Sequence, residues 1–140
     1  MLFRSVANDC TFTNNQATGV GGAIVSAQMT IARSTFTGNT AVYGGALYYT
    51  QGGGANFNIT DSTFTNNQAA VSGGLGGAIY SNGAATITRS QFNDNSTGWQ
   101  GGAVYGSGTL NLIDSIVKGN TADYGGGLNL SNGSDRKSVV

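Results

Sequence analysis

Five copies of one short pattern recur along this chain of 140 residues, and no other feature constrains its fold as strongly. Each copy contains a Phe-x-x-Asn element, with Val replacing Phe in the fifth copy, followed by two glycines, a small residue and an aliphatic residue. The copies start 24, 28, 28 and 25 residues apart. Five matching copies in so short a chain are not a coincidence. They predict a repeat protein in which each unit packs on its neighbours.

The repeat defines sets of equivalent positions along the chain. The Phe-x-x-Asn elements begin at Phe12, Phe36, Phe64, Phe92 and Val117 and end at Asn15, Asn39, Asn67, Asn95 and Asn120. The glycine pairs are Gly21 and Gly22, Gly44 and Gly45, Gly76 and Gly77, Gly101 and Gly102, and Gly125 and Gly126. The units therefore lie near residues 10–34, 35–62, 63–90, 91–115 and 116–133, within one repeat region that spans residues 1–133.

Each unit contains three short runs typical of β-strands, such as residues 77–80, 85–88 and 90–92. No window shows the apolar spacing of an amphipathic helix. Strands this short bury a face only when they stack on the next unit, about 4.8 Å away. A period near 25 residues is too short for a propeller blade, and the leucine pattern of leucine-rich repeats is missing. We therefore expect an all-β fold: a single-stranded parallel β-helix (solenoid) of about five coils with three short strands per coil.

Apolar residues at equivalent positions predict three stacks inside the helix. The first contains Ile31, Ile59, Ile87 and Leu112, the second contains the Phe and Val positions above, and the third contains Ile24, Leu47, Ile79, Val104 and Leu128. Two residues before each Phe or Val lies Cys10, Ser34, Ser62, Ser90 or Ser115. Alternation along a strand points this column inward too, so we interpret Cys10 as a small structural residue.

The parity of the apolar positions also predicts a corner in every coil. Ile59 precedes Phe64 by five residues, an odd offset, so one straight strand cannot bury both side chains. The bend falls near Asp61, and the equivalent positions are Asp9, Arg33, Asp61, Arg89 and Asp114. Their charges alternate in sign, so stacking replaces repulsion between like charges with weak attraction between exposed pairs.

The asparagine and glycine columns have a structural interpretation that we prefer. Asparagine tolerates positive φ and bonds to nearby backbone, and stacked amides also bond along the axis of a β-structure. A ligand-binding row of amides is the alternative. The paired glycines are expected to permit tight turns and close packing of the coils.

At these positions the chain resembles the repeats of the chlamydial polymorphic outer-membrane proteins, whose signatures are Gly-Gly-Ala followed by an aliphatic residue, and Phe-x-x-Asn. The resemblance covers about residues 10–130, and the fifth copy departs from it with Val117 for Phe and Gly127 for Ala. A right-handed parallel β-helix of the pectin-lyase-like class is the fold that this resemblance implies. It further implies a secreted domain displayed at the cell surface, often with an adhesive role.

Because pectin-lyase-like folds include polysaccharide lyases and hydrolases, an enzyme is the main alternative. Such sites need clustered carboxylates that bind calcium or act as acid and base. Here Asp61 and Asp114 are expected two coils apart with Arg89 between them, and the chain has no His and no Glu. Lys118 would be a candidate lyase base without a carboxylate cluster. We therefore predict no catalytic residue, no metal site and no cofactor.

Outward-facing side chains supply the candidate contacts. Tyr48, Tyr80 and Tyr105 follow the inward aliphatic residue and are expected to form a surface stripe, which would either bind protein or glycan or serve as a packing ladder. Threonine pairs at 11 and 13, 35 and 37, and 63 and 65 resemble the flat arrays of ice-binding β-helices. The simpler interpretation is that threonine suits an exposed strand. Sequons begin at Asn58, Asn95 and Asn132.

Composition narrows the partners. The formal net charge is zero and only 9% of residues are charged, so no basic surface for nucleic acid is predicted. No apolar run approaches the roughly 18 residues of a membrane-spanning helix. Residues 134–140 fit no repeat and match the reading of a common sequencing adapter, so we expect a non-native tail and a fragment of a larger protein. The expected function is a structural or adhesive module at the cell surface or outer membrane, contacting an unknown protein or glycan and the neighbouring coils of its parent chain.

Overall fold

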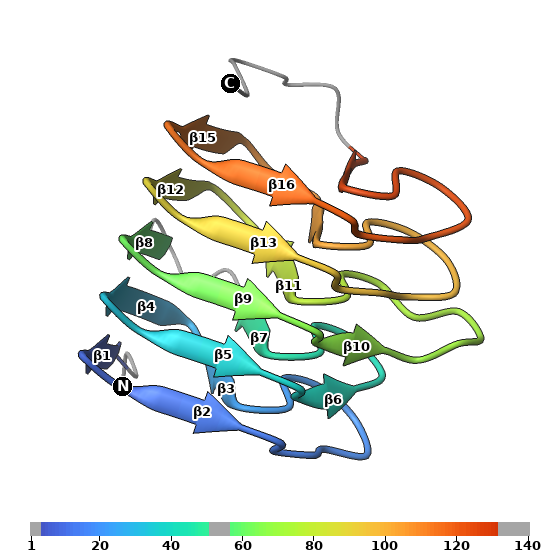
Figure 1. Cartoon of the computed structure of the whole chain (residues 1–140), viewed down its shortest axis with the longest axis horizontal. Coiled ribbons are helices and arrows are strands. Elements are labelled where there is room, and N and C mark those ends of the chain that lie inside the picture. The colour runs from blue at the N-terminus through green and yellow to red at the C-terminus, as the bar shows by residue number, and fades with distance from the viewer. Residues whose placement is uncertain (1–3, 51–56, 132–140) are drawn as a thin grey trace.

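The chain folds into a stack of flat coils in which every strand pairs in parallel with the equivalent strand of the next coil (Figure 1). The computed structural model describes residues 4–50 and 57–131. The expected non-native tail at 134–140 and the sequon at Asn132 lie outside these residues. All the described strand pairs join segments one repeat apart, which is the arrangement that the five-fold pattern predicts. The prediction of an all-β parallel solenoid of about five coils is confirmed.

Three five-stranded sheets form the sides of the solenoid. The first sheet contains β1 (Arg4–Asn8), β4 (Gln28–Ala32), β8 (Phe57–Thr60), β12 (Ala85–Thr88) and β15 (Leu110–Ile113). The second sheet contains β2 (Thr11–Thr13), β5 (Thr35–Thr37), β9 (Thr63–Thr65), β13 (Gln91–Asn93) and β16 (Ile116–Lys118). The third sheet contains β3 (Ile24–Ser26), β7 (Leu47–Thr50), β11 (Ile79–Asn82), β14 (Val104–Gly106) and β17 (Leu128–Leu130).

A short fourth ladder follows the second sheet, and the sequence did not indicate it. It consists of β6 (Thr40–Ala41) and β10 (Gln68–Ala69), and single parallel bridges from Gln68 to Ser96 and from Ser96 to Thr121 continue it. The chain then turns through the glycine pair into the third sheet. A second column of single parallel bridges, from Val20 to Tyr43, Leu75, Gln100 and Tyr124, lies just before the glycine pairs, so the three strands of a coil are accompanied by two further contacts between coils.

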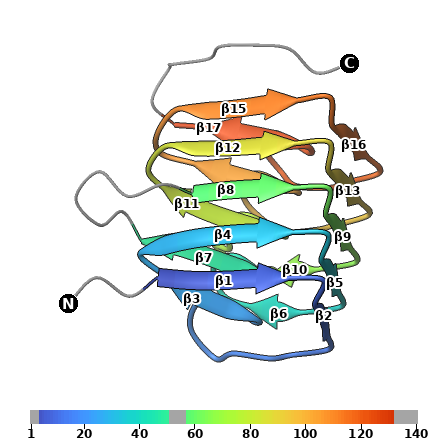
Figure 2. The same ribbon diagram turned by 90° about the vertical axis from the view of Figure 1, so that its left-hand side faces the viewer.

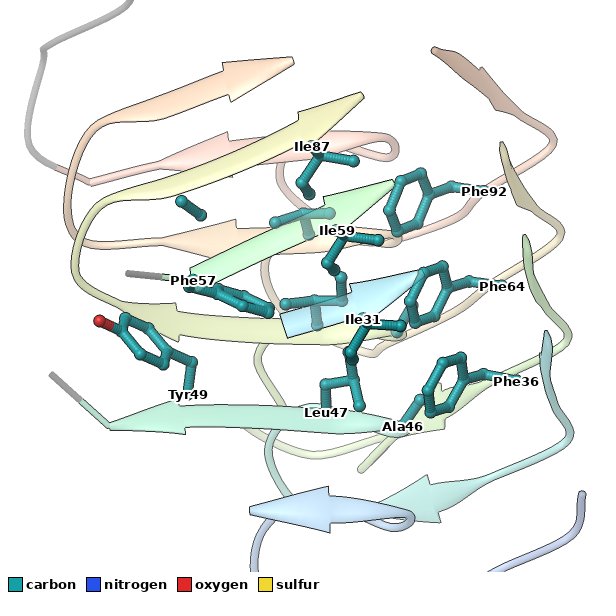
Figure 3. Packing of buried hydrophobic residues seen from close by; sticks show 14 of the residues in the cluster. Ile31, Phe36, Ala46, Leu47, Tyr49, Phe57, Ile59, Phe64, Ile87 and Phe92 are labelled. Carbon is teal, nitrogen blue, oxygen red and sulfur yellow. The ribbon is translucent and has the colours of Figure 1, made fainter. Parts of the chain in front are cut away.

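The predicted inward stacks form the core (Figure 3). The rings of Phe12, Phe36, Phe64 and Phe92 stack in sequence with centroids 4.7, 4.7 and 4.8 Å apart, which matches the spacing between paired strands. Ile31, Ile59 and Ile87 form the adjacent stack and are fully buried. Because both sets point into one narrow interior, each ring packs on aliphatic side chains as well as on the next ring.

The core also contains a column that the sequence analysis missed. Met29, Phe57, Ala85 and Leu110 pair along the first sheet and are all buried. Tyr49, on the third sheet, lies inside as well, and its ring stacks on Phe57 at 4.8 Å. These positions carry different residue types in each coil, so they do not appear as a repeated motif.

Candidate functional site

The asparagine column is a buried hydrogen-bonded ladder. The Asn67 side-chain oxygen accepts hydrogen bonds from the backbone N–H and the amide nitrogen of Asn39, both at 3.0 Å. The amide nitrogen of Asn67 donates in turn to Asn95 Oδ1 and to the carbonyl of Phe36. Asn39, Asn67 and Asn95 are fully buried, so these amides are engaged within the solenoid and do not face a ligand.

Positive φ occurs one residue before the ladder, which corrects the interpretation of the asparagines. The residues with positive φ at this position are Asn14, Gly38, Asn66, Asp94 and Gly119. No ladder asparagine in the described residues has positive φ. The residue before each ladder asparagine therefore adopts the left-handed conformation of the turn. The ladder asparagine itself contributes the hydrogen bonds of its side-chain amide.

The two glycines of each pair have different structural roles. The first, as at Gly76, has a positive φ of 67°, which only glycine adopts without cost. The second, as at Gly77, has no room for a side chain, because a Cβ there would collide with the carbonyl oxygen of Gly102 in the next coil. The first glycine of each pair thus permits the tight turn, and the second permits the close packing of neighbouring coils.

The serine column forms a second inward ladder beside the corner. Ser34 N–H donates to Ser62 Oγ at 3.1 Å, and Ser62 Oγ donates to the carbonyl of Thr60 at 2.8 Å. Cys10 N–H joins the same column by donating to Ser34 Oγ. Cys10 therefore occupies the first position of a structural ladder, and its thiol donates to the carbonyl of Asn8.

The charged column lies on the corner between the first and second sheets (Figure 2). All five of its members have positive φ between 47° and 56°. Arg33 pairs with both carboxylate oxygens of Asp9, and Arg89 pairs with both oxygens of Asp61 at 2.7 and 2.8 Å. These hydrogen bonds from arginine lower the pKa of Asp9 and of Asp61. The pairs are exposed, so water and salt screen them strongly.

The corner carboxylates of Asp61 and Asp114 are separated by an arginine. Arg89 lies between Asp61 and Asp114, and its guanidinium holds the Asp61 carboxylate. Within the ranges that the structure describes, no three His, Cys, Asp or Glu side chains lie close enough to hold a metal ion.

The tyrosine stripe is a packing ladder on the outer face of the third sheet. Tyr48 and Tyr80 stack at 4.7 Å with their planes 6° apart, and Tyr80 stacks on Tyr105 at 5.3 Å. Stacking covers both faces of Tyr80, and the ring of Tyr43 also packs on it at 6.1 Å with its plane tilted by 51°. Burial against its neighbours raises the pKa of Tyr80.

More exposed aromatic side chains lie on the turn that joins the second sheet to the third. Four large apolar side chains project from this turn: Tyr43, Val71, Trp99 and Tyr124, with exposed fractions of 36%, 76%, 47% and 60%. We call this set the aromatic edge. Trp99 and Tyr124 lie 6.3 Å apart with their rings tilted by 48°, so they are not stacked face to face. The sequence analysis missed this surface, although Tyr43 and Tyr124 both directly precede a glycine pair.

The residues of the aromatic edge lie on connections between the second and third sheets that differ in length from coil to coil. Backbone bridges join Tyr43 to Leu75, Leu75 to Gln100, and Gln100 to Tyr124. Residue 99 precedes a bridged position, and the backbone of Gly98 packs so closely on Val71 that a Cβ would not fit. Trp99 follows this close contact in the fourth coil and is 47% exposed.

The remaining outward features are placed as follows. The threonine pairs lie on β2, β5 and β9, and the same positions carry Gln91 and Asn93 on β13 and Ile116 and Lys118 on β16. The Asn58 side chain is half-buried on β8, whereas Asn95 is a buried rung of the asparagine ladder and is inaccessible to a glycosylating enzyme.

Comparison with known proteins identifies the fold family. No helix long and apolar enough to cross a membrane occurs in residues 4–50 and 57–131. The searches of curated proteins and of solved structures gave no match. A family model described as "right handed beta helix region" matches residues 3–140, nearly the whole chain. The chain therefore belongs to the right-handed β-helix family.

Proposed function

We propose that this chain is a non-catalytic module, displayed at a cell surface, that makes adhesive contacts through its aromatic edge. The observation that carries this proposal is that the connection between the second and third sheets bears one exposed large apolar side chain in each of four successive coils, namely Tyr43, Val71, Trp99 and Tyr124, of which Trp99 and Tyr124 lie 6.3 Å apart. Aromatic side chains dominate the energy of recognition surfaces because they bury a large area with few rotatable bonds. Backbone bridges between neighbouring coils, such as those of Tyr43 with Leu75 and of Gln100 with Tyr124, support this part of the chain.

The ring geometry favours the aromatic edge over the tyrosine stripe as the contact surface. The tilt of 48° between Trp99 and Tyr124 leaves ring faces available to a partner, whereas Tyr80 lies between two stacked neighbours. Both protein and glycan partners use such faces, through apolar packing or through the C–H groups of a sugar. Asp123, beside Tyr124, gives this part of the edge a negative charge, which disfavours nucleic acid.

The absence of catalysis is part of the proposal. The corner carboxylate of Asp61 is held by Arg89, and an acid–base pair needs two carboxyl groups that flank one substrate bond. The resemblance to the chlamydial outer-membrane repeats supports display on an outer membrane or in the extracellular space. Kinship with those proteins belongs to the same proposal.

The test is a binding screen on a glycan array and on intact cell surfaces, with Trp99→Ala and Tyr124→Ala. We expect each substitution to weaken binding about tenfold or more, as for an aromatic anchor. Val6→Ala is the matched control, because Val6 is 54% exposed but lies on the first sheet. Equal binding by all the variants would refute the aromatic edge as the contact surface.

A panel of polysaccharides with calcium tests the enzyme alternative on the same protein. We expect no release of unsaturated or reducing sugar ends. Release that disappears in Asp61→Asn, Arg89→Ala or Asp114→Asn would establish a lyase or hydrolase instead, and would overturn the non-catalytic assignment.

A further inference from the structure

The tyrosine stripe on the third sheet holds three phenol rings one above another. Tyr80 pairs with Tyr48 on β7 and with Tyr105 on β14 in the same parallel register. The rings of Tyr48 and Tyr80 are 4.7 Å apart with their planes 6° apart, whereas those of Tyr80 and Tyr105 are 5.3 Å apart and tilted by 21°. Equivalent ring atoms of Tyr48 and Tyr80, including the carbons beside the hydroxyl, are therefore about one strand spacing apart.

Tyr80 is the common neighbour of the rings in this group. Tyr43, on the turn before the third sheet, also packs on it. The pKa of Tyr80 is raised first by burial and then by the phenol groups of Tyr48, Tyr105 and Tyr43, so the hydroxyl ends of these side chains lie near one another. The three rings of the stripe are half-buried, which leaves part of each ring open to the solvent and to an oxidant.

Parallel phenol rings in register suit the coupling of two tyrosyl radicals. A one-electron oxidant removes an electron and the hydroxyl proton from each phenol, and the unpaired electron spreads to the carbons beside the oxygen. Two such carbons bond across the ring faces, because each becomes tetrahedral as the bond forms. The hydrogens on these carbons then move to the oxygens and restore both phenols as a dityrosine. Hydrogen peroxide, used by a haem peroxidase, takes up the two electrons and two protons and becomes water.

We propose that the tyrosine stripe is an oxidative modification site, at which peroxide and a peroxidase join Tyr48 to Tyr80 as a dityrosine within one chain. This pair is favoured over Tyr80 and Tyr105 because its rings are closer and more nearly parallel. The bond ties two neighbouring coils together covalently. The chain has a single cysteine, so a disulfide within the chain cannot do this. Closing a loop of one whole coil restricts the unfolded chain and so stabilises the fold.

The test treats the whole chain with a haem peroxidase and hydrogen peroxide at several protein concentrations. We expect dityrosine fluorescence in a product that stays monomeric on a denaturing gel and has lost two hydrogens by intact mass. Its yield should not depend on protein concentration. Tyr80→Phe should abolish it. Tyr124→Phe is the matched control and should leave the yield unchanged, because Tyr124 is 60% exposed but its ring neighbour is Trp99.

Two further variants and a stability measurement identify the bonded pair. Tyr48→Phe should lose the product, whereas Tyr105→Phe should keep it. Urea unfolding before oxidation should show that every variant retains the fold. After oxidation the urea midpoint of the unchanged protein should rise by about 1–2 M, and that of Tyr80→Phe should not. Products joined only between molecules, no intrachain product, its survival in Tyr80→Phe or Tyr48→Phe, or its loss in Tyr124→Phe would overturn the proposal.

Discussion

The asparagine ladder and the charged corner run along the same solenoid with the same period, yet they differ in what holds each rung. Asn39, Asn67 and Asn95 are fully buried, and each donates and accepts several hydrogen bonds. The corner side chains of Arg33 and Asp9 are 58% and 64% exposed. Water can replace the side-chain hydrogen bonds of the exposed Arg–Asp pairs, whereas water cannot reach a buried ladder group that has lost its hydrogen-bond partner.

This difference explains the pattern of residue types within the chain. All five copies have asparagine at the ladder position, where its amide both accepts from and donates to the equivalent residues of the neighbouring coils. The corner alternates between Asp and Arg, because it needs only opposite signs in adjacent coils. The buried ladder position thus requires one residue type, whereas the exposed corner position requires only that neighbouring coils carry opposite charges.

The largest expected effect comes from breaking the ladder at its centre. Asn67→Ala leaves the Asn39 N–H and one of the two Asn39 amide hydrogens without an acceptor, while the amide keeps its bond to the Phe12 carbonyl. It also removes the amide donor to the Phe36 carbonyl. At about 1–3 kcal/mol for each buried unsatisfied group, the loss in the free energy of unfolding should be about 3–5 kcal/mol. Urea unfolding measures it. The control is Asn15→Ala, on the exposed first rung, which should cost about 1 kcal/mol or less. Equal losses would show that burial does not separate the two rungs.

An intermediate effect is expected in the serine column, which is buried but makes fewer bonds. Ser62→Ala removes the acceptor of Ser34 N–H and the donor to the Thr60 carbonyl. We expect a loss of about 1–2 kcal/mol in the same urea experiment. Ser72→Ala, on an exposed turn, is the control and should leave stability unchanged. A loss as large as that of Asn67→Ala would mean that the number of bonds per rung does not matter.

The smallest effect belongs to the corner, and it should depend on pH. Arg89 lowers the pKa of Asp61 in the folded protein, so the pair stabilises the fold above the ordinary pKa of 3.8. The stabilisation is lost as the pH falls from there through the lowered folded value. Asp61→Asn should therefore cost little at pH 7 and nothing once the pH is below the folded pKa. Unfolding free energies measured against pH test this, with Asn67→Ala as a variant whose deficit should persist at every pH.

Much of the architecture could be predicted because equivalent positions in the five copies of the repeat can be compared with one another. The offset between Ile59 and Phe64 predicted the corner, and the alternating charges predicted the ion pairs of Asp9 with Arg33 and of Asp61 with Arg89. The inward column of Met29, Phe57, Ala85 and Leu110 escaped notice, because any apolar side chain of suitable size fills its place. The aromatic edge was missed because Val71 and Trp99 lie on turns that differ in length between coils.

The sequence by itself determined the register of the coils and the direction of each repeated side chain. Both follow from covalent geometry, since alternate residues of a strand point to opposite faces and equivalent residues stack one repeat apart. Only the tertiary structure decided which aromatic rings face the solvent. That property depends on the tilt between neighbouring rings and on the path of each turn, as the stacked Tyr48 and Tyr80 and the tilted Trp99 and Tyr124 show. Tilt and path are set by packing between residues a full coil apart, and a linear motif does not record them.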